Sequence, residues 1–294
     1  MQMICNLCPR GCGAVRTESE GNGYCRMPAL PVLARAALHP WEEPPISGTQ
    51  GSGTIFFSGC SLGCVFCQNE EISHKDFGKT VSLERLAEIC RQLEAQGAHN
   101  FNFVNPSHYA HVVRELQEKY PQKLPIVWNS GGYDRVETLR SLEGAVDIYL
   151  PDLKYLNADS AQRYSAAADY PQVAAAAIKE MVRQTGPYVL DEAGLMKRGV
   201  IIRHLVLPGQ LEGAKAVMDW IAGAFEPGTV LFSLMSQYTP WGRAPEFPEI
   251  NRKLRKGEIR AAREYMEILG LDGFTQEGES ARREYTPSFD LTGI

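Results

Sequence analysis

The chain has 294 residues, with 30 Lys and Arg against 35 Asp and Glu, which gives a formal net charge of −5 at pH 7. This balance argues against a general nucleic-acid-binding protein, because such proteins carry a surplus of basic residues. A hydrophobic fraction of 44% and a charged fraction of 22% exclude a disordered or fibrous chain. No apolar run reaches the roughly 18 residues of a membrane helix, and the first residues do not form a secretory signal. We therefore expect a cytoplasmic protein that binds neither nucleic acid nor membrane.

Apolar and amphipathic segments alternate after residue 53. In chain order, strands are predicted at residues 54–57, 101–104, 125–128, 146–150, 200–207 and 230–235. Helices are predicted after them at residues 83–93, 110–120, 135–142, through 174–177, and at 213–225 and 260–269. This alternation is typical of βαβ units, which build a parallel sheet. Six units predict an α/β fold, a partial (β/α)6 barrel similar to a TIM barrel, and a doubly wound sheet is the alternative.

Three regions of the chain differ in composition. Residues 1–30 are rich in Cys and Gly and too short to bury a core, so we interpret them as a cysteine-rich module ordered by a metal. Residues 31–52 are expected to be a connector, with a turn-rich break at Glu42-Glu43-Pro44-Pro45 and a glycine-rich turn at 51–54. Residues 53–294 form the predicted barrel.

The eight cysteines form two groups and one single residue. They stand at positions 5, 8, 12 and 25, at 60, 64 and 67, and at 90. Disulfide frameworks are typical of small secreted domains, so clustered thiols in this larger chain indicate metal or redox sites. Cys90 shares the apolar face of a predicted helix with Leu86 and Leu93, which predicts a core thiol.

Cys60, Cys64 and Cys67 lie on one short loop directly after the first barrel strand. Three thiolates can bind three irons of a [4Fe–4S] cluster and leave the fourth iron open to a substrate or cofactor. Phe66, between two of these ligands, can present its ring to a planar ligand. Three buried thiols or a zinc loop are the alternative, although three ligands make a poor structural zinc site.

Cys5, Cys8, Cys12 and Cys25 provide the four thiols of a closed metal site. The spacing of the first three favours a second iron–sulfur cluster, and zinc fits nearly as well. Two disulfides are the alternative, which an intracellular compartment disfavours.

Polar side chains follow the predicted strands at their carboxyl ends, where parallel barrels carry their chemistry. They are Asn105, Ser107 and His108 after the second strand, Asn129 and Ser130 after the third, Asp152 and Lys154 after the fourth, and Gln237 and Tyr238 after the sixth. We expect Asn105, Ser107, Asn129 and Ser130 to line a cofactor cleft. Arg203, a charge inside an apolar strand, is expected to have a partner in the same site. His108 could instead be merely exposed, and the pair 237–238 could be rim packing.

The cysteine loop, with its aromatic residue before the last cysteine, resembles the signature of the radical S-adenosylmethionine (radical SAM) superfamily. Further similarity to the pyruvate formate-lyase activating enzymes, and to an uncharacterised branch related to them, lies at Cys67-Gln68-Asn69, Pro151-Asp152-Leu153-Lys154 and residues 203–209. The activating enzymes carry a Gly-Gly-Glu element after the second strand, where this chain has residues 104–108 with the sequence Val-Asn-Pro-Ser-His. The resemblance therefore covers most of the chain but departs from the family at one cofactor-binding element.

The resemblance implies that S-adenosylmethionine (SAM) binds the open iron of a [4Fe–4S] cluster and is cleaved reductively to methionine and a 5′-deoxyadenosyl radical. That radical removes hydrogen from a substrate. Asp152 and Lys154 would contact the methionyl part of SAM, Phe66 would pack near its adenine, and Arg203 would belong to the same cofactor site. The implied partners are an electron donor such as flavodoxin or ferredoxin and a substrate, which in the activating enzymes is a glycyl-radical enzyme.

Three functional hypotheses follow. The first is an activase that places a glycyl radical on a partner enzyme. The second is a radical SAM enzyme that modifies a small molecule or a peptide. The third, from a different class, is a non-catalytic iron–sulfur electron carrier or zinc scaffold.

Overall fold

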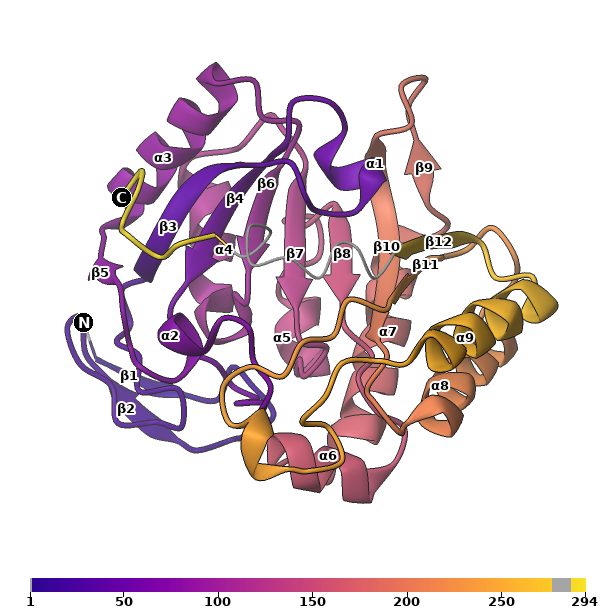
Figure 1. Cartoon of the computed structure of the whole chain (residues 1–294). Helices are drawn as coiled ribbons and strands as arrows, with labels where there is room; N and C mark the ends of the chain where they lie inside the picture. The colour runs from indigo at the N-terminus through magenta and orange to yellow at the C-terminus, as the bar shows by residue number, and fades with distance from the viewer. Residues whose placement is uncertain (1, 277–286) are drawn as a thin grey trace.

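The computed structural model describes residues 2–276 and 287–294. Within this part of the chain, a ten-stranded sheet has the order β12-β11-β10-β8-β7-β6-β4-β3-β5, and β9 pairs with β10 (Figure 1). The strands from β4 to β12 along this order are parallel, whereas β3 is antiparallel to both β4 and β5. An α/β fold with a mostly parallel sheet is thus confirmed, and it is consistent with a partial barrel.

The parallel strands are β4 (Ser52–Phe57), β6 (Phe101–Val104), β7 (Ile126–Ser130), β8 (Ile148–Pro151), β10 (Met196–Leu205), β11 (Leu231–Met235) and β12 (Gly273–Gln276). The antiparallel strands of this sheet are β3 (Val32–His39), β5 (Lys79–Thr80) and β9 (Val189–Leu190). The helices are α1 (Pro44–Ser47), α2 (Glu70–Ser73), α3 (Leu83–Ala95), α4 (Ala110–Lys119), α5 (Val136–Arg140), α6 (Ala158–Ser165), α7 (Tyr170–Thr185), α8 (Leu211–Ala224) and α9 (Lys256–Leu269). All six predicted strands are present, with ends shifted by a few residues.

Two expectations before the barrel are wrong. The segment 31–52, expected as a connector, contains the eight-residue strand β3, which pairs along its length with β4. Its sequence, VLARAALH, is rich in alanine rather than in β-branched residues, so it lacks the usual composition of a strand. The turn expected at 51–54 is also wrong, because Ser52 and Gly53 begin β4. A Cβ at Gly53 would lie 2.8 Å from the carbonyl oxygen of Asn100, so glycine permits a close approach rather than a turn.

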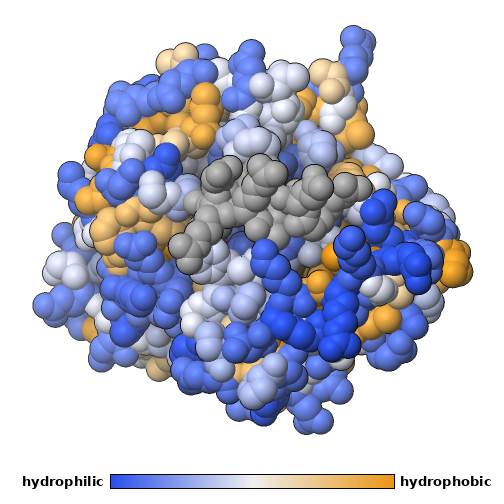
Figure 2. Space-filling model, viewed as in Figure 1, coloured by the Kyte–Doolittle hydropathy of each residue, from blue (hydrophilic) through white to orange (hydrophobic). Residues whose placement is uncertain are grey.

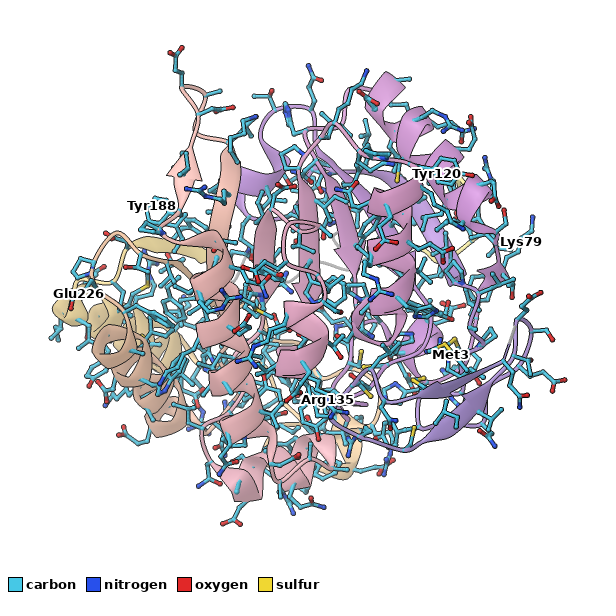
Figure 3. All side chains as sticks on the ribbon, turned by 180° about the vertical axis from the view of Figure 1, so that it is seen from behind. Met3, Lys79, Tyr120, Arg135, Tyr188 and Glu226 are labelled. Atoms are coloured by element: carbon cyan, nitrogen blue, oxygen red, sulfur yellow. The ribbon has the colours of Figure 1, made fainter. Side chains whose placement is uncertain are left out.

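Side chains alternate between the two faces of the sheet. Phe103, Trp128 and Ile202 belong to the large outer core, where the helices pack, and Figure 3 shows these helices in front of the sheet. Val127, Ile148, Leu150, Ile201 and Leu231 form a second cluster on the inner face, together with Ile46 of α1. Figure 1 shows α1 at the end of the sheet opposite to the arrowheads of β7 and β8. The short helix α1 therefore closes the amino end of the barrel.

The amino-terminal segment packs at the carboxyl end of the barrel. Strands β1 (Met3–Cys5) and β2 (Ala14–Arg16) form an antiparallel ribbon, which lies beside α2 in Figure 1. The buried Arg16 guanidinium donates hydrogen bonds to the carbonyl oxygens of Pro28 and His108, the latter at 2.6 Å. Arg16 thus links the ribbon to the loop after β6.

The face in Figure 2 is mainly hydrophilic, with hydrophobic residues in separate groups. Every helix among the described residues is too short or too polar to cross a membrane.

Candidate active site

The loop between β4 and α2 presents Cys60, Cys64 and Cys67 at the carboxyl end of the barrel. Each sulfur accepts a hydrogen bond from a different part of the chain. The backbone N–H of Leu62 donates to Cys60 Sγ at 3.3 Å, Ser165 Oγ donates to Cys64 Sγ at 3.1 Å, and Ser73 Oγ donates to Cys67 Sγ at 3.3 Å. Donors at all three sulfurs suit thiolates, because they stabilise negative charge.

Cys64 is buried, and Cys60 and Cys67 are half-buried. Burial first, and then the neighbouring thiol Cys60, raises the pKa values of Cys64 and Cys67, that of Cys67 to about 12. Among the described residues, no three Cys, His, Asp or Glu side chains converge on a metal position. The donor set still fits a three-thiolate cluster, since the thiols share one loop and each sulfur has a hydrogen-bond donor. Metal binding would deprotonate these thiols.

Two side chains after β6 support the start of the cysteine loop. Asn105 Nδ2 donates to the carbonyl oxygen of Gly59 at 2.8 Å, and the His108 ring contacts the carbonyl oxygen of Ser58 at 2.7 Å. Gly59 has φ +81°, and a Cβ there would lie 3.0 Å from the carbonyl oxygen of Cys25. Burial, followed by the charge of Arg16, lowers the pKa of His108 to about 3. His108 is therefore a buried neutral support of the loop, and its alternative reading as an exposed residue is wrong.

Ser107 and Ser130 share one acceptor that the sequence analysis missed. Ser107 Oγ donates to Asp134 Oδ1 at 2.6 Å, and Ser130 Oγ donates to Asp134 Oδ2. Burial raises the pKa of Asp134, although both hydroxyl groups lower it. The carboxylate thus ties together the loops after β6 and β7. Ser107 and Ser130 lie at the carboxyl end of the sheet, as expected. Their hydroxyl groups, however, are engaged with Asp134 and hold two loops together.

Asp152, Lys154 and Arg203 form one partly buried ionic group after β8 and on β10. Lys154 Nζ lies 2.6 Å from Asp152 Oδ2, and Arg203 Nε lies 2.9 Å from Asp152 Oδ1. Arg203 Nη2 also donates to Asn129 Oδ1 at 2.6 Å. The partner expected for Arg203 is therefore present, and Asn129 faces this ionic group.

Charge keeps this group ionised despite its burial. Burial raises the pKa of Asp152, but the charges of Arg203 and Lys154 lower it by more. The net shift of this pKa is therefore downward. Burial lowers the pKa of Lys154, and the Asp152 carboxylate and the Cys64 thiol raise it by more. The Lys154 ammonium and the Asp152 carboxylate can each leave the other and pair with the carboxylate and the ammonium of a bound amino acid. That chemistry fits the methionyl end of SAM.

Glycines after β7 bring the chain close to this ionic group. A Cβ at Gly131 would lie 3.7 Å from Lys154 Cε, and one at Gly132, with φ +74°, would collide with the carbonyl oxygen of Asp152.

Phe66 is buried and meets Tyr238 edge to face, with ring centroids 6.0 Å apart. Tyr238 donates its hydroxyl to the carbonyl oxygen of Ile250 at 2.9 Å, which supports the packing reading of this residue.

The amino-terminal thiols lie within reach of one another's charges. Burial raises the pKa of Cys8 to about 11. A backbone hydrogen bond opposes this shift, and the neighbouring thiols Cys25, Cys5 and Cys12 add to it. Burial also raises the pKa of Cys25, to which Cys5 and Cys12 contribute. Figure 3 shows sulfur atoms in the region between Met3 on β1 and Arg135. Four thiols fit a closed metal site chemically, although they do not converge on one position.

Arg10 connects this segment to the cysteine loop. Its guanidinium donates to the carbonyl oxygens of Ser61 at 2.8 Å and Leu62 at 3.0 Å, and to those of Ser165 and Ala166 at 3.1 and 2.6 Å. It also lies over the Tyr24 ring, 4.1 Å from the centroid. The sequence offered no signal for this role, because the four hydrogen bonds join positions more than 50 residues apart.

The sequence profile of the radical SAM superfamily matches residues 54–221, which is more than half of the chain. The chain belongs to the radical SAM superfamily. It is also 34% identical over 278 residues to an uncharacterized protein of Methanocaldococcus jannaschii, a match that covers 91% of this chain and 75% of that relative. The family implies an enzyme with a [4Fe–4S] cluster and SAM.

Two solved structures share the fold at low sequence identity. SuiB of Streptococcus suis, in a crystal structure with bound SAM, matches with a TM-score of 0.52 and 15% identity over 77% of this chain and 50% of SuiB. This chain therefore spans about half the length of SuiB. Methylornithine synthase matches with a TM-score of 0.51 and 15% identity over 82% of this chain and 71% of that enzyme. A domain of a pyruvate-formate lyase-activating enzyme from Bacteroides vulgatus has a TM-score of only 0.37, at 13% identity over 74% of this chain and all of that domain.

Proposed function

We propose that the chain is a radical SAM enzyme whose catalytic cluster is held by Cys60, Cys64 and Cys67. The observation that carries this proposal is the hydrogen bonding of all three sulfurs on one loop at the carboxyl end of β4. A [4Fe–4S] cluster bound there would supply the electron that cleaves SAM to methionine and a 5′-deoxyadenosyl radical, which abstracts hydrogen from the substrate.

The side chains beside the loop divide the work of holding SAM. Lys154 would bind the methionyl carboxylate and Asp152 the methionyl ammonium, because these two groups already pair with each other at 2.6 Å. Arg203 holds Asp152 in place from the opposite side at 2.9 Å. Phe66 would pack near the adenine. Asn105 fixes the backbone of Gly59, and Asp134 fixes the loops that carry Ser107 and Ser130.

Reductive SAM cleavage tests this proposal. Protein reconstituted with iron and sulfide without oxygen, and then reduced with dithionite, should convert SAM to 5′-deoxyadenosine. Cys64→Ala should lose this product by at least about a hundredfold. Cys90→Ala is the matched control and should retain it, because Cys90 is a core thiol on α3. Equal product from Cys64→Ala and wild type, or no product at full cluster loading, would contradict the proposal.

The amino-terminal cysteines are proposed to hold a second metal, either an iron–sulfur cluster or zinc. Support comes from the four mutually interacting thiols Cys5, Cys8, Cys12 and Cys25, and from the docking of their segment on the cysteine loop through Arg10. A metal there would order a segment too short for its own core.

Activation of a glycyl-radical enzyme is the finer form of the proposal, with flavodoxin or ferredoxin as the electron donor. Its support is the similarity at Asp152-Leu153-Lys154 and at residues 203–209 to the activating enzymes. The absence of the Gly-Gly-Glu element after β6 favours instead a small-molecule or peptide substrate. A glycyl-radical enzyme encoded beside this protein, which gains a glycyl radical signal on incubation with it, would decide for the activase.

A further inference from the structure

The inner face of the sheet carries further polar side chains beside the ionic group of Asp152, Lys154 and Arg203. On β6, Asn102 lies between Phe101 and Phe103, which both belong to the outer core, so its side chain points inward. On β10 and β11, Arg203 and Ser233 are direct neighbours in the parallel register. Both Asn102 and Ser233 are fully buried.

Two carboxylates approach Arg203 from the amino end of the barrel. Glu42 and Glu43 directly precede α1, which closes that end in Figure 1. Arg203 Nη1 lies 3.4 Å from Glu42 Oε2 and 3.8 Å from Glu43 Oε2. Glu42, Glu43, Asn102, Arg203 and Ser233 are named here the inner polar ring. Its acids come from a segment outside the residues that match the superfamily profile.

Four buried atoms of the inner polar ring lack a hydrogen-bond partner among the described residues. They are Glu43 Oε2, both amide atoms of Asn102, and Ser233 Oγ. Burial raises the pKa values of Glu42 and Glu43. Asn102 faces Glu42 and Ser233 faces Glu43, and they offset part of these shifts without reaching full hydrogen-bond geometry. Unpaired buried polar groups are costly, so a polar ligand that reached this place would gain several hydrogen bonds.

The charged side chains at this place carry a net negative charge, which a cation would neutralise. Glu42, Glu43 and Asp152 outnumber Arg203 and Lys154, so one negative charge is in excess when all five groups are ionised. Burial raises the pKa of Glu43 to about 7, Arg203 lowers it in part, and the neighbouring carboxylate of Glu42 raises it, because the two acids share one guanidinium. The side chains of Glu42, Arg203 and Asp152 keep 11–17% of their surface exposed, whereas Glu43, Asn102 and Ser233 are buried behind them.

We infer that the inner polar ring binds a cationic amine or guanidinium group of the substrate. This inference names the substrate class of the proposed radical enzyme and therefore rests on that function. The cation would donate hydrogen bonds to Glu43 Oε2 and Asn102 Oδ1 and would supply the missing positive charge. Ser233 Oγ would accept a further hydrogen bond. Through Arg203, the ring adjoins Asp152, so a substrate anchored there lies next to the cofactor.

Ligand-induced stabilisation tests this inference without relying on SAM cleavage. The Tm of the full chain is measured against matched pairs of probes at constant ionic strength: n-butylamine with n-butanol, L-lysine with L-norleucine, and L-arginine with L-citrulline. At least one cationic probe should raise Tm in a saturable manner, and its uncharged counterpart should not. Glu43→Gln should weaken that binding by about tenfold or more, since it removes the charged acceptor.

Two further variants complete the experiment. Ser233→Ala removes only an unpartnered hydroxyl, so it should fold normally and weaken the same probe by about threefold or more. Glu264→Gln changes an exposed acid on α9 and should leave binding unchanged. The inference fails if no cationic probe shifts Tm, if charged and uncharged probes act equally, or if Glu43→Gln and Ser233→Ala both bind like wild type. Because reductive SAM cleavage is assayed separately, loss of either result identifies which proposal has failed.

Discussion

At the scale of single residues, the site depends on side chains whose partners are distant in sequence. Asp134 accepts hydrogen bonds from Ser107 and Ser130, and Arg203 joins Asp152 to Asn129. The sequence brings the cysteines, Asp152 and Lys154 into the candidate site through short spacings, and their roles there stay predictions. Asp134 and Glu43 could not be predicted from it, because a buried carboxylate and an acidic turn look alike until the chain folds.

Replacement of Asp134 by alanine should destabilise the protein. It leaves the hydroxyls of Ser107 and Ser130 without their buried acceptor. We expect the free energy of unfolding in urea to fall by roughly 2–4 kcal/mol. Asp134→Asn keeps an acceptor oxygen and should lose less. Equal stability of Asp134→Ala and wild type would show that the carboxylate does not hold the two loops together.

Glu43 should make the stability of the protein depend on pH. Its pKa of about 7 in the folded chain lies above the ordinary value of 4.5, because burial outweighs the charge of Arg203. The folded state then binds the proton more tightly, so stability falls as pH rises from 4.5 through about 7 and is level above that. Since Gln resembles the protonated acid, Glu43→Gln should match wild type near pH 5 and exceed it near pH 8 by on the order of 3 kcal/mol.

Urea denaturation at several pH values measures this difference, with Glu264→Gln as the control for loss of an exposed acid. The difference between Glu43→Gln and wild type isolates Glu43 from the buried histidines His108 and His204. Their lowered pKa values reduce stability as pH falls below about 6.5 in both proteins alike. A difference that is constant with pH would contradict the assignment of a raised pKa to Glu43.

At the scale of elements, the barrel strands were predictable and the elements around them were not. The strands from β4 to β11 are short apolar runs separated by helices, a pattern that length and hydrophobicity reveal. Strand β3 has an alanine-rich sequence and forms because β4 and β5 supply its partners. The ribbon β1–β2 similarly depends on contacts with the barrel, through Arg10 and Arg16. These contacts are tertiary, so no local period indicates them.

Loss of the Arg10 guanidinium should release the amino-terminal segment from the cysteine loop. Arg10→Ala removes all four hydrogen bonds to carbonyl oxygens, and Arg10→Lys keeps the charge without the planar fork. We expect amide hydrogen exchange in residues 2–30 and 59–67 to accelerate by about tenfold or more in Arg10→Ala, with Arg10→Lys intermediate. Unchanged protection in both segments would show that Arg10 does not dock them.

At the scale of the whole molecule, two cysteine groups adjoin one carboxyl end of a mostly parallel sheet. The catalytic assignment rests on superfamily membership and on the loop of Cys60, Cys64 and Cys67. The second metal is independent of it and testable by composition. Reconstituted wild type should contain about four irons for the catalytic cluster, together with either about four more irons or one zinc.

Replacement of Cys5, Cys8, Cys12 and Cys25 by alanine should remove only the second portion of metal. The catalytic cluster keeps its own ligands, so about four irons per chain should remain, as measured by mass spectrometry of the metals. An identical metal content in wild type and in this variant would exclude an amino-terminal metal site.

We propose above all that the loop of Cys60, Cys64 and Cys67 holds an open cluster that binds SAM. The most direct measurement is the electron paramagnetic resonance spectrum of the reduced protein, with and without SAM. The variant that lacks the four amino-terminal cysteines is the sample of choice, because only the catalytic cluster can contribute to its signal. We expect a [4Fe–4S] signal that changes when SAM is added and disappears in Cys64→Ala. A cluster signal that SAM leaves unchanged, or that persists in Cys64→Ala, would contradict this proposal.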